Sequence, residues 1–206
     1  MGCGRGYLTF AVWHLLAREF GLPEAHVTGI EARPDLVENA NQLAQRLQLQ
    51  GLQFQVGTIA ETDPSPIDLL IALHACNTAT DDALCQGVRK QAKLILVAPC
   101  CHQELRPKLV PPLILAPLLR HGLLTERLSG WLTDGLRALY LEAAGYRTKL
   151  IEFVGSEHTP KNLLLAGVRS EHPLSAPEHQ QAREQIAQLK AHFGLQQLAL
   201  DPLLDR

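Results

Sequence analysis

The chain has 206 residues, of which 46% are hydrophobic and 19% charged, and its formal net charge at pH 7 is −2. This length suits one domain with a sizeable core, and the charge excludes a strongly polyelectrolyte protein, so any nucleic-acid site must be a local patch. Five cysteines without zinc-ribbon spacing indicate a reducing, cytoplasmic compartment, and no apolar run approaches the length of a membrane span.

The chain opens on three glycines, Gly2, Gly4 and Gly6, and a helical pattern follows them at once. Glycines before a helix let backbone N–H groups approach a ligand closely, because no Cβ stands in the way. The dinucleotide fingerprint Gly-x-Gly-x-x-Gly is excluded, since its third glycine would fall at Tyr7 or Thr9. The pattern therefore predicts a loop for another ligand, with a plain glycine-rich turn as the alternative.

Strand and helix patterns alternate along the rest of the chain, which predicts a doubly wound α/β sheet. We expect strands at 26–31, 52–56, 67–76, 93–98, 146–154 and 162–168, the last two pairing antiparallel because no helix separates them. We expect a helix from Pro34 with an apolar stripe of Leu36, Ala40, Leu43 and Leu47, a helix capped by Thr80, a helix from Thr133 to Ala144, and a polar helix at 177–193. Residues 103–130 should be largely irregular, and Asp134 and Arg137 should form a surface ion pair.

Candidate ligand-binding residues follow the first two predicted strands. Glu31 ends the strand after the glycine loop, where an acid can accept hydrogen bonds from ribose hydroxyls; an exposed loop acid is the alternative. Thr58 and Ile59 follow the next strand, where an adenine ring would lie. The sequence thus favours a nucleoside-containing ligand at these three positions.

Thiols and imidazoles follow two later strands, where open α/β sheets bind their ligands. They are His74 and Cys76 on one strand end, and Cys100, Cys101 and His102 on the next. An imidazole here can act as a general base near neutral pH. A zinc site is one alternative, and cysteines that merely fill apolar space are another, which we favour for Cys3 and Cys85.

Four segments together carry a family resemblance: 2–9 with the glycines, 73–76 (LHAC) with Asp81 beyond, 99–102 (PCCH), and 158–162 (HTPKN). They resemble one group of class I S-adenosylmethionine (SAM)-dependent methyltransferases, which contains the tRNA 2′-O-methyltransferases with a CHHC zinc finger and the glutathione-S-transferase-C-terminal-domain-containing proteins. The resemblance runs from Gly2 to about Arg169. It implies SAM held by Gly2, Gly4, Gly6 and Glu31, and methyl transfer to an acceptor, RNA (tRNA or rRNA) above all, beside His74, Cys76, Cys100, Cys101 and His102.

The resemblance also implies the sheet order 3-2-1-4-5-7-6, with the first strand missing from this chain, a methyltransferase domain at 1–170 and a helical tail at 171–206. The CHHC finger is absent from the sequence, and Arg5 stands where the group usually has Lys. Because a missing central strand would leave backbone groups unpaired, we expect an N-terminally truncated chain that folds poorly and binds SAM weakly. The other functions open at this point are a non-catalytic scaffold or RNA-binding module, a protein or small-molecule methyltransferase, and a metal- or thiol-dependent enzyme.

Overall fold

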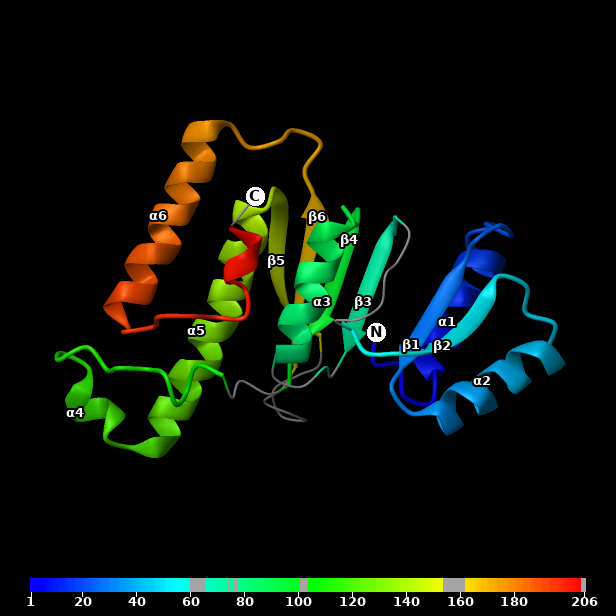
Figure 1. Ribbon diagram of the computed structural model, residues 1–206, viewed down its shortest axis with the longest axis horizontal. Helices are drawn as coiled ribbons and strands as arrows, with labels where there is room; N and C mark the ends of the chain where they lie inside the picture. Colours follow the sequence, from blue (N-terminus) through cyan, green and yellow to red (C-terminus); the bar gives the residue numbers. More distant parts are fainter. Residues whose placement is uncertain (60–65, 74, 76–77, 101–103, 154–161, 205–206) are drawn as a thin grey trace. The chain divides into compact units, whose positions relative to one another are not determined.

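The computed structural model describes residues 1–59, 66–73, 75, 78–100, 104–153 and 162–204 (Figure 1). The chain folds into two compact units, Met1–Asp63 (unit 1) and Pro64–Arg206 (unit 2). Strands and helices alternate in both units, and parallel strand pairs occur in each. The predicted α/β class is therefore confirmed.

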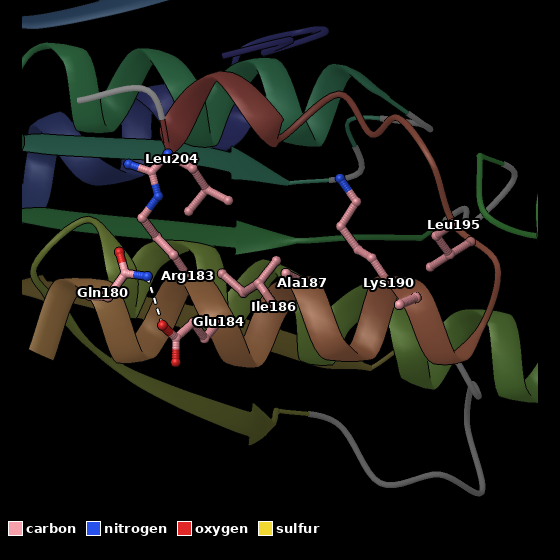
Figure 2. A pocket seen from close by; sticks show the side chains of 9 residues that line it. Gln180, Arg183, Glu184, Ile186, Ala187, Lys190, Leu195 and Leu204 are labelled. Carbon is pink, nitrogen blue, oxygen red and sulfur yellow. Dashed lines mark hydrogen bonds between the residues drawn. The ribbon is translucent and has the colours of Figure 1, made fainter.

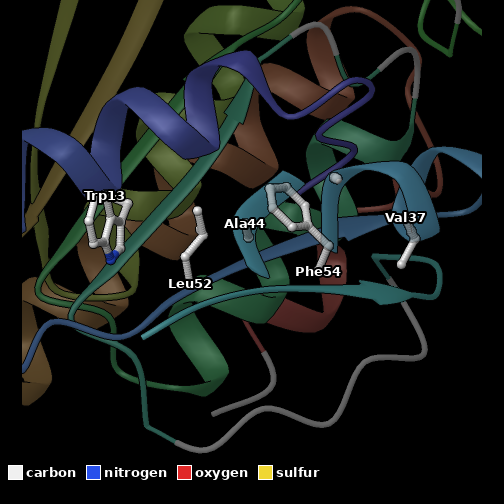
Figure 3. Close-up of a cluster of buried hydrophobic side chains, with 6 residues drawn as sticks. Trp13, Val37, Ala44, Leu52 and Phe54 are labelled. Carbon is white, nitrogen blue, oxygen red and sulfur yellow. The ribbon is translucent and has the colours of Figure 1, made fainter. Parts of the chain in front are cut away.

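Unit 1 contains a parallel pair of strands, β1 (Val27–Glu31) and β2 (Leu52–Val56). Two helices pack against this pair, α1 (Tyr7–His14), which continues as a short π-helix at Leu15–Glu19, and α2 (Pro34–Arg46). Figure 3 shows the core between them, which consists of Trp13, Val37, Ala40, Ala44, Leu52 and Phe54. The buried indole N–H of Trp13 donates to the carbonyl of Gln50 at 2.8 Å, so its one polar atom is satisfied.

The buried face of α2 differs from the predicted one. Val37, Ala40 and Ala44 are 4–6% exposed, whereas Leu43 and Leu47 are 43% and 57% exposed. The helical spacing of the buried residues was predicted correctly, but the buried face is rotated relative to the predicted one. The helix packs on the strands through small alanines rather than through its leucines.

Asn41 joins α2 to the backbone of β2. Its side-chain amide donates to the carbonyl of Phe54 at 2.9 Å, and its Oδ1 accepts from the N–H of Phe54 at 2.9 Å. The two bonds satisfy both backbone groups of a buried residue on this strand.

Unit 2 contains a four-stranded sheet with the order β3-β4-β6-β5. Its strands are β3 (Leu69–Leu73), β4 (Leu94–Ala98), β5 (Tyr146–Glu152) and β6 (Leu163–Arg169). β3 and β4 are parallel, and β6 pairs antiparallel with both β4 and β5, so the predicted closing antiparallel pair is confirmed. If β1 to β6 are strand positions 2 to 7, the neighbours within each sheet are those of the predicted order.

Helices α3 (Thr78–Arg89) and α5 (Gly122–Ala143) pack on one face of this sheet and contact each other (Figure 1). The strand residues beneath them alternate along each strand and are at most 2% exposed: Leu70, Ala72, Ile95, Val97 and Leu165. Gly87 of α3 lies so close to the sheet that a Cβ would come within 2.6 Å of Ile95. A close helix–sheet contact therefore holds α3 directly against β3 and β4.

The long helix α5 corrects the predictions for residues 103–130 and for Thr133. The segment 103–130 contains the short helix α4 (Ala116–Leu119) and the first nine residues of α5, so it is more helical than expected, and Thr133 lies within α5 instead of capping it. The Thr133 hydroxyl donates to the carbonyl of Ser129 at 2.6 Å, and the Ser129 hydroxyl donates to that of Thr125 at 2.7 Å. Hydroxyl residues that suggested a helix start thus bond back to the preceding turn.

The C-terminal helix α6 (Ala176–His192) lies close to its predicted range and begins with a capping box between Ser175 and Glu178. It packs against α5, and the chain after it, including the 3₁₀ helix Asp201–Leu203, returns to α3 and α5. The Asp201 carboxylate accepts hydrogen bonds from Lys190 Nζ at 2.6 and 2.8 Å and from the Tyr140 hydroxyl. None of the helices in the described part of the chain combines the length and apolar character needed to cross a bilayer.

Candidate functional site

The glycine loop forms a tight turn into α1. Gly2, Gly4 and Gly6 all have positive φ angles, of 65°, 57° and 79°. The N–H of Gly6 donates to the carbonyl of Cys3 at 2.9 Å, and the carbonyl of Gly6 accepts the first helical bond, from Phe10, at 2.9 Å. Gly6 also packs so tightly that a Cβ would lie 2.7 Å from the ring of Phe54. Both the backbone conformation and the packing therefore require glycine at this position.

Hydrogen bonds fasten the loop to the carboxyl end of β1. The N–H of Cys3 donates to the carbonyl of Ile30 at 2.9 Å, and the N–H of Gly4 donates to Oε2 of Glu31 at 2.7 Å. The predicted ribose-binding acid is therefore not a solvated loop residue, because it is 7% exposed and bonded to the loop itself.

The second oxygen of Glu31 is bonded to Arg33. Oε1 accepts from Arg33 Nε at 2.8 Å and from the Arg33 backbone N–H at 3.3 Å. The guanidinium bond above all, with the backbone bonds from Gly4 and Arg33, holds the pKa of Glu31 below its ordinary value, against the effect of burial. Glu31 is therefore an ionised acceptor at neutral pH.

The segment after β2 lies beside Glu31, since the N–H of Gly57 donates to the Glu31 carbonyl at 3.0 Å. In this segment Thr58 is exposed and Ile59 is buried. The six residues predicted to bind the cofactor thus gather at the carboxyl ends of two adjacent parallel strands in unit 1, where α/β sheets hold ligands.

The loop has room for a ligand at its first two glycines. A Cβ on Gly2 would have no heavy atom within 4 Å, and a Cβ on Gly4 would have only Arg33 Nη2, at 4.0 Å. These glycines are required by their positive φ and not by crowding, so the open space over the backbone is available to a bound molecule. An acidic acceptor beside a glycine backbone that leaves room for a ligand fits a nucleoside-containing cofactor.

The residues predicted to act in catalysis belong to unit 2. His74, Cys76, Cys101 and His102 lie outside the described residues. Cys100 is partly buried and follows β4, whose last residue, Ala98, pairs with Leu73 at the end of β3. The two strand ends that precede these residues therefore meet at one edge of the unit 2 sheet.

Helix α3 begins directly after this edge. Thr80, in its first turn, is fully buried and donates its hydroxyl to the carbonyl of Ala75 at 2.5 Å. Thr80 thus lies inside the helix, which begins at Thr78, and not before it as a cap. Among the residues that the structure describes, no three His, Cys, Asp or Glu side chains are grouped to hold a metal ion.

A buried ionic cluster behind this edge was not predicted. Arg137 on α5 donates to Asp81 on α3, from Nε at 2.7 Å and from Nη2 at 3.1 Å, and to Asp134 from Nη1 at 3.2 Å. The predicted pairing of Asp134 with Arg137 is therefore confirmed, but its predicted surface location is wrong, because these residues are 7% and 1% exposed. The sequence held a signal, since Arg137 lies one turn from Leu141 on the apolar face of the helix.

Unit 2 also has an open groove of about 490 Å³ along α6 (Figure 2). Arg183, Ile186 and Lys190 of the helix line it together with Leu195 and Leu204. None of the predicted site residues that the structure describes borders this groove.

Comparison with known families and structures gives one family match. A family model described as a methyltransferase domain matches residues 1–108, slightly more than half of the chain. No curated protein matches the chain. The family match covers the glycine loop, Glu31, Thr58 and Ile59, and extends past Cys100.

Three solved structures of similar fold are a CMeT domain, a SAM-dependent methyltransferase and a protein named only PH0226. The citrinin polyketide synthase CMeT domain has a TM-score of 0.50 and 15% identity, over 84% of this chain and 46% of that chain. A SAM-dependent methyltransferase from Aquifex aeolicus has a TM-score of 0.49 and 16% identity, over 81% and 77% of the two chains. The PH0226 protein from Pyrococcus horikoshii OT3 has a TM-score of 0.49 and 15% identity, over 82% and 79%. At these identities the likeness concerns the fold alone.

Proposed function

Because the chain belongs to the family of methyltransferase domains, we propose that it transfers a methyl group from SAM to an RNA acceptor, tRNA or rRNA. The observation that best supports SAM as the cofactor is the hydrogen bond between the glycine loop and Glu31, which measures 2.7 Å from Gly4 N to Oε2. It places an ionised acceptor for ribose hydroxyls directly beside the glycine loop, in one small site.

The cofactor-binding residues follow from this site. Glu31 accepts the ribose hydroxyls, Gly2, Gly4 and Gly6 let the methionine part approach the backbone, and Thr58 and Ile59 border the adenine. SAM supplies an electrophilic methyl group on a sulfonium sulfur. What remains for the protein is to position the acceptor and to accept its proton.

The acceptor site belongs at the edge where β3 and β4 end. We assign it to Cys100 together with His74, Cys76, Cys101 and His102, which follow the same two strands in sequence. A neutral imidazole is suited to accept the proton of a hydroxyl or amine acceptor near neutral pH. The buried cluster of Asp81 and Arg137 supports this edge from behind, because it fixes the first turn of α3 against α5.

RNA as the acceptor is supported by the surface of residues 104–131, which follow this edge. The segment contains Arg106, Lys108, Arg120 and Arg127 against two glutamates, although the whole chain is slightly acidic. Lys108 pairs with Glu104 at 2.8 Å and Arg106 with Glu126 at 4.0 Å, so Arg120 and Arg127 supply the excess positive charge. Trp131 is 71% exposed and can stack on a base. This local excess of basic residues with an exposed aromatic side chain favours RNA as the acceptor.

Cofactor binding is tested by titration calorimetry of SAM into this chain and into a form extended upstream in the reading frame. Binding by either form supports the proposal, and Glu31→Gln should weaken it at least tenfold, since a neutral amide is a poorer acceptor for two hydroxyls. Glu38→Gln, which changes an exposed acid on α2, is the matched control. Failure of both forms to bind SAM would refute the function.

The acceptor is tested with methyl-labelled SAM and separate pools of tRNA, rRNA, protein and small molecules. Label in RNA that is lost on ribonuclease treatment is the expected result. Arg120→Ala with Arg127→Ala should lower RNA methylation more than Arg147→Ala, which removes an exposed arginine of β5. Label in protein or small molecules would replace the RNA acceptor, and SAM binding without transfer to any pool would favour a non-catalytic module.

A further inference from the structure

Most hydrogen-bond acceptor sites of Glu31, the acid proposed to hold the ribose, are already occupied. Glu31 Oε2 accepts from the Gly4 N–H at 2.7 Å, and Oε1 accepts from Arg33 Nε at 2.8 Å and Arg33 N at 3.3 Å. An ionised carboxylate has about four lone-pair sites. One site therefore remains, whereas two vicinal ribose hydroxyls require two.

The side chain of Arg33 also lies over the glycine loop. Its Nη2 is the one heavy atom within 4 Å of a Cβ built on Gly4, at 4.0 Å. The guanidinium thus lies beside both Oε1 of Glu31 and the loop at Gly4, where a ribose held by this carboxylate would lie. The Arg33 side chain is 63% exposed and can turn into water.

We infer that Arg33 is a displaceable cap on the cofactor site: its guanidinium occupies the ribose position in the unliganded protein and leaves Oε1 when the ribose binds. This inference rests on the proposed function. Arg33 touches the group that binds the cofactor, so it lowers the affinity of the site for ligands with two adjacent hydroxyls.

The cap has a measurable cost to binding. An ion pair whose arginine is exposed to water contributes little, up to ~1 kcal/mol, so displacing the guanidinium from the buried Glu31 lowers affinity about three- to fivefold. A ligand with a single ribose hydroxyl can use the free site on Oε2 and need not displace Arg33. The cost therefore falls on the diol alone.

The test measures binding of S-adenosylhomocysteine and its 2′-deoxy analogue at pH 7.5 by calorimetry, with the form of the protein that binds SAM. Arg33→Ala should bind S-adenosylhomocysteine about three- to fivefold more tightly than the natural protein and the deoxy analogue equally well. Arg46→Ala, which removes an exposed charge from the end of α2, should bind both ligands as the natural protein does. Circular dichroism melting verifies that each variant is folded.

The possible outcomes separate this inference from the function on which it rests. Equal or weaker binding of the diol by Arg33→Ala overturns the cap and shows instead that Arg33 is neutral or holds Glu31 in place. A gain of the same size for the deoxy analogue, or for Arg46→Ala, also overturns it, because the effect would then be one of net charge. If no form of the natural protein binds SAM, the proposed function itself has failed.

Discussion

Arg137 and Asp81 form a two-bond ion pair in the interior of unit 2, with side chains that are 1% and 2% exposed. Burial alone disfavours a charged guanidinium, but the hydrogen bonds with Asp81, and the charge of Asp134 beside it, hold the pKa of Arg137 above its ordinary value. The cluster joins the first turn of α3 to the middle of α5. Arg137 is therefore charged and held in place wherever the protein is folded.

Removing one partner of this pair should strongly destabilise the protein. Asp81→Asn leaves a buried guanidinium without its main counter-charge, which costs about 3–5 kcal/mol. Urea denaturation measures the loss in free energy of unfolding. Asp68→Asn is the matched control, because it breaks an ion pair with Lys93 whose partners are both more than 70% exposed, and such pairs contribute little. Equal effects of the two substitutions would show that the interior pair is not special.

The glycine loop offers a matched pair of substitutions. Gly2→Ala and Gly6→Ala both force a side chain into a positive φ, at about 1 kcal/mol each. Only Gly6→Ala also drives a methyl into Phe54, so it should cost at least ~1 kcal/mol more. Thermal denaturation compares them, and similar melting temperatures would contradict the packing of Gly6 on Phe54.

The lowered pKa of Glu31 predicts a pH dependence of stability. A carboxyl whose pKa is lower folded than unfolded stabilises the fold above its ordinary value of 4.5, and this stabilisation is lost as the pH falls through the folded pKa. The difference in free energy of unfolding between the natural protein and Glu31→Gln should therefore be greatest above pH 4.5 and shrink below it. Urea titrations between pH 7 and pH 3 measure this difference. Arg33→Ala removes the main cause of the shift and should reduce the effect, and a difference that grows on acidification would refute it.

Asp201 fastens the C-terminal segment to α5 and α6. Burial opposes its ionisation, but the bonds from Lys190 and Tyr140 outweigh burial and lower the pKa of Asp201. Asp201→Ala should cost about 1–3 kcal/mol, because the buried Tyr140 and the partly buried Lys190 lose their acceptor. Hydrogen exchange should show faster opening of 176–204 than in the control Glu171→Gln, an exposed loop acid. Unchanged exchange would mean that apolar packing alone holds the segment.

The strands were predictable because their apolar runs are short and bounded by turn residues; the 52–56 strand has its predicted ends. The buried faces of the helices were harder to predict than the strands. In α2 the leucines outweighed the alanines in the pattern, yet Ala40 and Ala44 form the contact, since close approach to the strands favours small side chains. In α5 the glycines at 122 and 130 and the prolines before them concealed its first half, which tertiary packing nonetheless holds helical.

The site was predictable where the sequence shows what the backbone conformation requires. Three closely spaced glycines and an acid at a strand end point to a loop and an acceptor. The bond between Arg33 and Glu31 was not predicted, because the direction of an exposed arginine depends on rotamers that no pattern records. Arg137 was placed on the surface because a charge was assumed to be solvated.

The side-chain amide of Asn41 affects whether β2 can pair with a strand from another molecule. Because it takes both the N–H and the carbonyl of Phe54, the middle of β2 has no backbone groups left to offer a strand from another molecule. Exposed strand edges are the usual starting points of intermolecular pairing. One side chain of α2 thus blocks backbone pairing at the middle of this strand, without an additional strand or helix to cover it.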